Sequence, residues 1–374
     1  MKEQGEKAKA HALVFIVSSV SLISYPIRER KRAMFNEGIQ KVISGQHLTR
    51  QEARQFMHQM MNGEWTNVQV ASLLTALRIK EETAEELIGF AEGMRSYAIK
   101  VEHSLVDAVD TCGTGGDGAN TFNISTAAAF VAAAAGVPIA KHGNRAASSK
   151  CGSVDVLEAL GMNVAHDAQM ARQMLQETNI CFLFAPLYHQ AMKHVMPTRK
   201  ELGFRTCFNL LGPLTNPANV KRQLLGVFDH SLTPIIAEAL VGLGVERALV
   251  VASLDGLDEL TVSGSTRVSE VRNGQIFNYL LSPEEVGLSS HPLEALKGGD
   301  AKQNAEIIRR VLEGENGAPR DIVVFNAGAV LYLADRVGSV QEGVSEAQKI
   351  IDTGKAKAKL IEAIQSSRRV KHVS

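Results

Sequence analysis

Cysteine is scarce in this chain, and its spacing excludes two classes of protein. The sequence has four cysteines among 374 residues and no Cys-x-x-Cys pair. A disulfide framework needs more cysteines, and a structural zinc site needs them closely paired or combined with histidines. We therefore expect reduced thiols in a cytoplasmic protein at Cys112, Cys151, Cys181 and Cys207.

Net charge is absent as well. Forty Lys and Arg residues balance forty Asp and Glu residues, so the formal net charge at pH 7 is zero. Such a chain has no overall electrostatic attraction to nucleic acid or to an anionic membrane, and we expect neither partner. The hydrophobic content of 45% is ordinary for a globular protein, and 374 residues are enough for two domains.

A membrane-spanning run of apolar residues is also missing. The apolar run at residues 12–25 is shorter than the ~20 residues that a spanning helix needs. Pro26 ends this run, and Arg28 and Arg30 follow where a secretory signal would have a small-residue cleavage site. We expect residues 1–33 to be an extension outside the core and the folded protein to begin near Met34.

From Met34 to about residue 101 the sequence has the periodicity of amphipathic helices. Thr49 and Glu52 have the spacing of a capping box in front of one helix. Apolar residues at positions 70, 73, 74 and 77 predict a second helix, and Thr83 precedes a third that ends near Met94. The pattern predicts a small all-helical domain over residues 34–106.

The rest of the chain alternates between short apolar runs and helical stretches. The runs predict strands at 137–140, 180–184, 247–252 and 322–325, and helices are expected at 167–178, 232–243, 302–313 and 341–351. Residues 254–280, with Asn273-Gly274, predict a hairpin. We expect an α/β fold in which residues 107–198 and 221–374 form the larger domain, around a mainly parallel central sheet. The helical segment 199–220 is expected to return to the first domain.

A glycine-rich loop stands at the start of this larger domain. Gly113, Gly116 and their neighbours at 115 and 118 surround Asp117, and such a loop can offer free backbone N–H groups to an anion. Asn123 or Ser125 is a candidate N-cap for a helix over 127–136, whose N-terminus would also attract phosphate. The loop matches neither GxxxxGK[ST] nor GxGxxG, so it could be a tight turn without a ligand. The predicted helix that follows the loop favours a phosphate site.

Three further groups of polar residues predict a ligand site. Lys141 to Arg145 follow a predicted strand and lead to Ser148, Ser149 and Ser153, and such a strand end is where α/β sheets bind ligands. The carboxylates of Asp258 and Glu259 could hold Mg²⁺ with substrate phosphates or form a solvated acidic turn. Arg199 and Arg205 could bind a substrate carboxylate or form interface ion pairs, and the sequence leaves this choice open.

Taken together, these motifs resemble those of the anthranilate phosphoribosyltransferases. The resemblance covers about residues 34–364 and rests on GTGGDG, NIST, KHGNRxxSSxxGSxDxLExLG, FxFAPxxHxAM, PxRxxLGxRTxFNxLGPLxNP and LDELT. It implies the transfer of the phosphoribosyl group of phosphoribosyl pyrophosphate (PRPP) to the amine of anthranilate, with two magnesium ions. It also implies a helical domain hinged to an α/β domain, and a homodimer formed through the helical domains.

The resemblance implies a role for each matching residue. The PRPP site is expected to consist of Gly113, Gly116, Asp117, Thr121, Asn123, Ser125, Thr126, Lys141, His142, Gly143, Asn144, Arg145, Ala146, Ala147, Ser148, Ser149 and Ser153. Anthranilate is expected at Gly113, Asn144 and Arg199, and magnesium at Ser125, Asp258 and Glu259. Catalysis is expected to depend on Arg199 and Asn144, which align anthranilate, and on His142 as a candidate proton acceptor.

Two other functions fit part of the pattern. A pyrimidine nucleoside phosphorylase has a similar architecture and a similar phosphate-binding wall, and the Asp258-Glu259 pair and the segment PTRKELGFRT argue against it. A non-catalytic relative that binds nucleic acid is the second alternative, and the balanced charge and intact motifs argue against that one.

Overall fold

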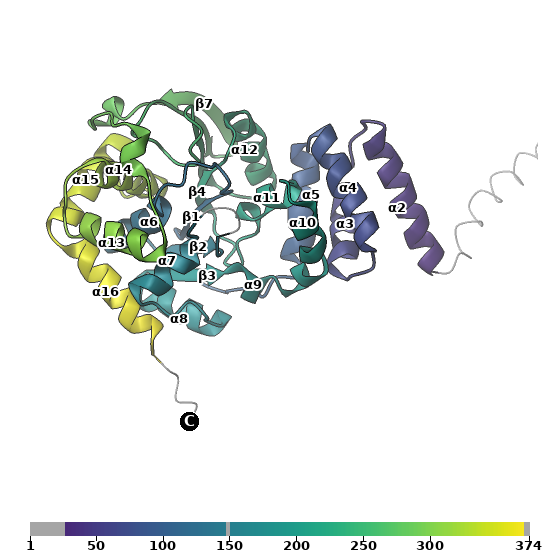
Figure 1. Cartoon of the computed structure of the whole chain (residues 1–374), viewed down its shortest axis with the longest axis horizontal. Coiled ribbons are helices and arrows are strands. Elements are labelled where there is room, and N and C mark those ends of the chain that lie inside the picture. The colour runs from purple at the N-terminus through teal and green to yellow at the C-terminus, as the bar shows by residue number, and fades with distance from the viewer. Residues whose placement is uncertain (1–26, 147–149, 370–374) are drawn as a thin grey trace, which may run out of the picture.

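The computed structural model describes residues 27–146 and 150–369. A bundle of helices lies at one end of the molecule, and a sheet covered by helices forms the larger part (Figure 1). The first helices are α2 (Ile27–Ile43), α3 (Arg50–Met61), α4 (Asn67–Lys80) and α5 (Ala84–Arg95). Thr49 and Thr83 close capping boxes with Glu52 and Glu86, which confirms both predicted helix starts. The predicted extension covers residues 1–33. Residues 1–26 lie outside the described part of the chain, and residues 27–33 belong to α2, which begins at Ile27.

The sheet has seven strands within the described part of the chain, in the order β3-β2-β1-β4-β5-β6-β7. They are β1 (Val109–Gly113), β2 (Ile139–Gly143), β3 (Ile180–Phe184), β4 (Arg222–Gly226), β5 (Arg247–Ser253), β6 (Thr266–Arg272) and β7 (Gln275–Leu281). Strands β1 to β5 pair in parallel, and β6 and β7 pair antiparallel. The prediction of an α/β fold with a mainly parallel sheet and a helical bundle is therefore confirmed.

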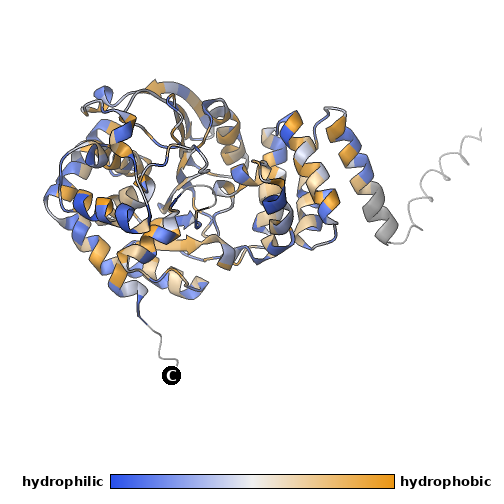
Figure 2. Cartoon of the chain, viewed as in Figure 1, coloured by the Kyte–Doolittle hydropathy of each residue, from blue (hydrophilic) through white to orange (hydrophobic). Residues whose placement is uncertain are grey.

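Two hydrophobic cores hold the elements together. The first joins the sheet to α6 (Ile124–Ala134), α13 (Ala301–Leu312), α14 (Ala318–Leu333), α15 (Val340–Asp352) and α16 (Lys355–Ser367). The second joins the opposite face of β4 and β5 to α12 (Thr233–Gly242), α11 (Cys207–Leu211) and the N-terminal helices. Hydrophobic residues, orange in Figure 2, alternate with hydrophilic ones along these helices, and the hydrophobic ones contribute to the two cores. In the described chain no helix combines the length and hydrophobicity needed to cross a membrane.

The remaining α-helices lie between β2 and β4 in the chain, and the first two pack on the α/β part of the molecule. They are α7 (Ser153–Leu160), α8 (Ala168–Thr178), α9 (Ala185–Tyr188) and α10 (Met196–Leu202). Helix α10 contacts α4, and α11 contacts α5, so the segment that follows β3 lies against the N-terminal helices. Helices α10 and α11 therefore lie between the helical bundle and the sheet in the second core.

The predicted strand at 322–325 is wrong, because these residues lie inside α14. A run of four apolar residues has the same appearance in a buried strand and in a helix buried on all sides. Strands β1 and β4 were not predicted, since each contains polar residues.

The helix expected at 127–136 begins at Ile124, with Asn123 at the N-cap position but without a capping hydrogen bond from its side chain. The predicted hairpin is confirmed as β6 and β7, with positive φ at Asn273 and Gly274.

Candidate functional site

The carboxyl ends of β1 and β4 meet the loop that follows β5. This loop carries Asp258 and passes so close to the ends of β1 and β4 that no side chain fits there. A Cβ atom at Gly113 would lie 2.5 Å from Asp258 Oδ2, and one at Gly226 would lie 1.6 Å from the carbonyl oxygen of Asp258. Glycine at both positions therefore lets the acidic loop cross the strand ends, the usual location of ligand sites in α/β sheets.

The glycine loop faces the same carboxylate. The backbone N–H of Gly115 donates to Asp258 Oδ2 at 2.8 Å, and Gly115, Gly116 and Gly118 have positive φ. Arg205 holds the loop from the other side, since its guanidinium donates to the carbonyl oxygen of Gly116 at 2.6 Å. One of the predicted anion-binding N–H groups is thus bonded to a carboxylate of the protein.

Asp258 and Glu259 form a pair of carboxyl groups with raised pKa values. Burial, followed by the charge of Asp117, raises the pKa of Asp258 to about 7. Burial and the charge of Asp258 raise the pKa of Glu259 to about 8, although Lys141 acts in the opposite direction. The backbone N–H of Ser125 donates to Glu259 Oε1 at 3.2 Å. The pair needs a positive charge to remain ionised at neutral pH.

These oxygen atoms fit a magnesium ion. Hard divalent cations prefer carboxylate oxygens, and Mg²⁺ commonly binds one or two carboxylates together with phosphate and water. The described residues contain no group of three or more His, Cys, Asp or Glu side chains that could hold a metal ion by itself. Substrate phosphate and water would therefore have to complete the coordination.

Lys141 at the end of β2 lies near Glu259, and His142 follows it in the strand. The buried ammonium group of Lys141 donates to the carbonyl oxygen of Thr111 and to Ser125 Oγ at 3.1 Å. The ring of His142 lies 5.2 Å from the ring of His189. Burial and this neighbour lower the pKa of His142 to about 3, and burial lowers the pKa of His189 to about 4. Both imidazoles are therefore neutral at pH 7.

The loop after β2 is closed by acidic residues of α7. The guanidinium of Arg145 donates to Glu158 at 2.7 and 2.8 Å and to Asp155 Oδ1 at 3.0 Å. Asp155 Oδ2 accepts the backbone N–H groups of Ala146 and Gly152, each at 2.9 Å. Arg145 is thus engaged by protein carboxylates, and Asn144 beside it is exposed. The predicted ligands Ala147, Ser148 and Ser149 lie outside the described residues.

The other predicted PRPP residues have mixed surroundings. Asn123 donates to the carbonyl oxygen of Cys151 at 3.2 Å and accepts from Asn304 at 3.0 Å. Thr126 is buried, and its hydroxyl has no hydrogen-bond partner among the described residues. Thr121 forms a bridge with Lys297.

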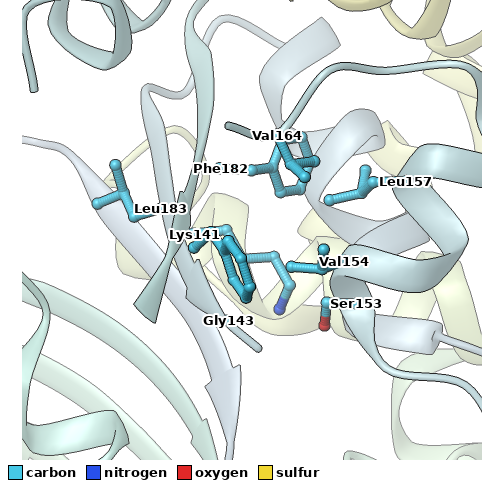
Figure 3. A pocket seen from close by; sticks show the side chains of 9 residues that line it. Lys141, Gly143, Ser153, Val154, Leu157, Val164, Phe182 and Leu183 are labelled. Carbon is cyan, nitrogen blue, oxygen red and sulfur yellow. The ribbon is translucent and has the colours of Figure 1, made fainter. Parts of the chain in front are cut away.

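Ser153 and Gly143 line a small cavity with Lys141 (Figure 3). Its volume of about 10 Å³ is close to that of one water probe, so it is too small for either substrate.

Arg199 and Arg205 differ in what they bind. Arg205 donates to the glycine loop and stacks on Phe228, with its guanidinium carbon 4.2 Å from the ring centroid. Arg199 on α10 lies over the ring of Phe208 at 5.0 Å and donates to Met196 Sδ at 3.8 Å, and it forms no ion pair with a carboxylate among the described residues. Burial lowers its pKa. Arg199 is therefore the guanidinium of this pair that is available for a substrate carboxylate.

Several residues of the site were not singled out from the sequence. Asp110 accepts the backbone N–H of His142 at 3.1 Å and the amide of Asn216 at 2.8 Å. His189 and Gly226 also belong to this group. Asp155 could have been found from the sequence, because it stands in the motif GSxD. Gly226 could not, because it ends a strand that was not predicted.

Comparison with known proteins places this geometry in a family. Residues 105–357 match the model of the glycosyl transferase family, a/b domain, and residues 36–98 match that of the glycosyl transferase family, helical bundle domain. The chain is 55% identical over 327 residues to the anthranilate phosphoribosyltransferase of Brevibacillus brevis, and the aligned residues cover 87% of this chain and 96% of the relative. It is 50% identical over 332 residues to that of Acetivibrio thermocellus, covering 89% and 96%.

Solved structures agree with these matches. The anthranilate phosphoribosyltransferase of Thermus thermophilus superimposes with a TM-score of 0.84 at 45% identity, over 89% of this chain and 99% of that one. The enzyme of Saccharomyces cerevisiae in complex with PRPP and Mg gives a TM-score of 0.82 at 30% identity, over 90% and 98%.

Proposed function

Since this chain belongs to the anthranilate phosphoribosyltransferase family, we propose that its glycine loop, its β2 wall and its acidic loop carry out the family reaction. The activity is transfer of the phosphoribosyl group of PRPP to the amine of anthranilate, giving N-(5-phosphoribosyl)anthranilate and pyrophosphate. Family membership decides for this reaction over the nucleoside phosphorylase and the nucleic-acid-binding protein considered from the sequence. The crossing of Asp258 over the glycine loop is the structural observation that best supports the proposal.

The glycine loop and Lys141 are proposed to bind the phosphates. Breaking the bond between C1 of the ribose and pyrophosphate builds negative charge on the leaving group. Fixed N–H groups and cations near that charge stabilise the transition state without having to reorganise. Lys141 is already held in place by Thr111 and Ser125. Ser125, Asp258 and Glu259 would hold magnesium, which would supply further positive charge near the leaving pyrophosphate.

Magnesium is known from the solved relatives, since the yeast enzyme was crystallised with PRPP and Mg. That this chain binds two ions is a proposal. The adjacent carboxyl groups of Asp258 and Glu259 support it, because carboxylate oxygens are ligands that Mg²⁺ prefers and burial raises the pKa of both groups in the absence of a cation.

Anthranilate is proposed to bind between Asn144, Gly113 and Arg199. The yeast relative has been solved with 4-fluoroanthranilate. A guanidinium fork matches the planar carboxylate of such a substrate, and Arg199 has no carboxylate of the protein to compete. Because the amine of anthranilate is a weak nucleophile, alignment toward C1 is the main task of these residues.

His142 is the candidate acceptor for the proton of the amine. Its imidazole is neutral at pH 7 and can accept a proton, but a pKa of about 3 makes it a weak base. We therefore predict that His142→Asn lowers kcat by less than the roughly 100-fold that loss of a strong general base costs. Steady-state turnover at saturating PRPP and anthranilate measures the effect, and a larger loss would assign His142 a stronger role.

The location and the domains are further parts of the proposal. Cys112, Cys181 and Cys207 are buried free thiols, which supports a reducing, cytoplasmic location. We take residues 34–106 with the segment 199–220 as the helical domain, supported by the contacts of α10 with α4 and of α11 with α5. Residues 107–198 and 221–374 are then the PRPP-binding domain.

The experiment that tests the function follows the fluorescence of anthranilate itself. We expect the signal to fall only when PRPP, Mg²⁺ and the protein are all present, and omission of each component is the control. A signal that stays constant while PRPP still binds would mean that the phosphate site is right and the acceptor is wrong.

A further inference from the structure

The acidic loop that follows β5 is held at its base by its own side chains. The hydroxyl of Ser253 accepts the backbone N–H of Leu257 at 2.7 Å, and the N–H of Ser253 donates to the carbonyl oxygen of Leu257 at 2.9 Å. Asp255 accepts hydrogen bonds from the hydroxyls of Ser253 and Ser263. These contacts fix the start and the end of the loop. They do not reach Leu260, which follows Glu259 directly.

A single buried amide holds that position. Asn326 lies on α14, which packs against β4 and β5, and its side chain is completely buried. The backbone N–H of Leu260 donates to Asn326 Oδ1 at 3.2 Å, and Asn326 Nδ2 donates to the carbonyl oxygen of Leu260 at 2.9 Å. Nδ2 also donates to the carbonyl oxygen of Ile322 at 2.9 Å, one turn earlier in α14. Asn326 thus bonds both polar backbone groups of Leu260.

We propose that Asn326 is a positioning residue for the magnesium site, acting on Glu259 and Asp258 through the backbone of Leu260. The two carboxyl groups repel each other, and repulsion between ionised groups would move an unrestrained loop toward solvent. A fixed peptide at Leu260 opposes that movement and keeps the oxygens facing Ser125 and the glycine loop. The inference rests on the proposed function, because it takes Asp258 and Glu259 as metal ligands.

A role in core stability alone would produce a different result. Any variant that removes a buried, fully bonded amide destabilises the fold, so a loss of activity cannot separate the two roles. Metal affinity can, because partners that orient metal ligands contribute about 10- to 100-fold to binding. A variant that only loosens the core, measured well below its unfolding temperature, keeps its metal affinity.

The experiment measures Mn²⁺ binding to the full chain in the presence of PRPP, from the loss of the electron paramagnetic resonance signal of free Mn²⁺. Asn326→Leu is expected to raise the Kd about 10-fold or more. Val330→Ala is the matched control, since Val330 is completely buried one turn further along α14 and forms no side-chain hydrogen bond to the acidic loop. Its Kd is expected to stay within about 2-fold of the parent value, because no metal ligand is displaced.

Asn326→Asp separates the effect of loop position on Mn²⁺ binding from the effect of charge. It is also the variant to measure if Asn326→Leu does not fold. The aspartate has the same size and accepts the N–H of Leu260, but it presents an oxygen to the carbonyl group of Leu260. Its negative charge alone would tighten cation binding. Weaker Mn²⁺ binding therefore supports positioning, and an unchanged or lower Kd in the variants that fold overturns it.

Glu259→Gln distinguishes this inference from the function on which it rests. If Glu259→Gln weakens Mn²⁺ binding and the Asn326 variants do not, only the role of Asn326 is overturned. If Glu259→Gln binds Mn²⁺ as tightly as the parent, the metal site is assigned wrongly and the role of Asn326 is overturned with it.

Discussion

Arg199 differs from Arg145 and Arg205 in what its guanidinium touches. Arg145 is bound by Glu158 and Asp155, and Arg205 by the glycine loop, whereas Arg199 stacks on Phe208 and donates to Met196 Sδ at 3.8 Å. A charged hydrogen bond to a substrate contributes about 1.5–3 kcal/mol. We therefore predict that Arg199→Ala raises the KM for anthranilate roughly 10- to 100-fold and leaves the KM for PRPP nearly unchanged. Steady-state kinetics with each substrate varied in turn measures both values.

Arg199→Lys is the matched control for this prediction. Lysine keeps the charge but not the planar fork that fits a carboxylate in a bidentate manner. We expect an intermediate KM for anthranilate. Equal KM values in the parent and in Arg199→Ala would show that the carboxylate of anthranilate is bound elsewhere.

The buried pair His142 and His189 predicts sensitivity to acid. In the folded protein their pKa values are about 3 and about 4, whereas an unfolded histidine titrates near 6.5. Between these values the unfolded state binds more protons than the folded state. Stability from these groups is therefore present above pH 6.5 and is lost as the pH falls toward 4. We expect the unfolding temperature of the metal-free protein to fall less steeply with acid in His189→Asn than in the parent.

Asp258 and Glu259 act with the opposite sign in the same pH range. Their folded pKa values are raised, so the folded state keeps protons that the unfolded state has released. This contribution is common to the parent and to His189→Asn, and the difference between the two unfolding profiles isolates the histidine. Identical slopes in both proteins between pH 6.5 and 5 would refute the assignment.

At the scale of elements, α7 and the loop before it act as one unit. Asp155 bonds the backbone on both sides of the loop, at Ala146 and Gly152, and also pairs with Arg145. Leaving buried N–H groups unpaired costs about 1–3 kcal/mol. We predict that Asp155→Ala raises the KM for PRPP roughly 10-fold, because Ala146 and Gly152 lose the carboxylate that holds their backbone N–H groups. Initial-rate measurements at varied PRPP concentration give this value.

Glu158→Gln is the control for that element. Glu158 pairs with Arg145 and, among the described residues, bonds no backbone group of the loop, so its loss is expected to change the KM for PRPP by less than about 3-fold. If Glu158→Gln has the larger effect, the charge of Arg145 is more important than the backbone bonds of Asp155.

At the scale of the whole molecule, the outer face of α4 is an apolar groove. Val68 and Ile79 are 76% and 79% exposed there, and Ala71, Ser72, Thr75 and Ala76 complete the lining. An exposed apolar patch of this kind is typical of a protein interface. We propose that it pairs two copies of the chain through their helical domains, as the family resemblance implies. Ile79→Glu is predicted to convert the dimer to a monomer in sedimentation velocity.

Val106→Glu is the matched control for the interface. Val106 is 80% exposed and lies outside α4, so a charge there is not expected to alter assembly. A parent protein that sediments as a monomer at micromolar concentration would refute the proposed dimer.

Features set by neighbouring residues could be predicted from the sequence. Capping boxes at Thr49 and Thr83 depend on side chains three residues apart, and β3 is an apolar run of strand length. Strands β1 and β4 could not be found in this way, because Asp110 and Gln223 interrupt their apolar character although both are buried. Residues 322–325 of α14 read as a strand from the sequence because their burial on all sides removes the periodic pattern.

The sequence by itself determined the family, the two-part fold and the segments that carry the chemistry, because these depend on local motifs in a fixed order. Only the tertiary structure decided which side chains are available to a substrate. Gly115 and Asp258 are 143 residues apart in the chain and share a hydrogen bond, and Asn326 reaches Leu260 across 66 residues. Arg145 and Arg199 are the same residue type and each lies over an aromatic ring, and only folding placed two carboxylates beside Arg145 and none, among the described residues, in an ion pair with Arg199.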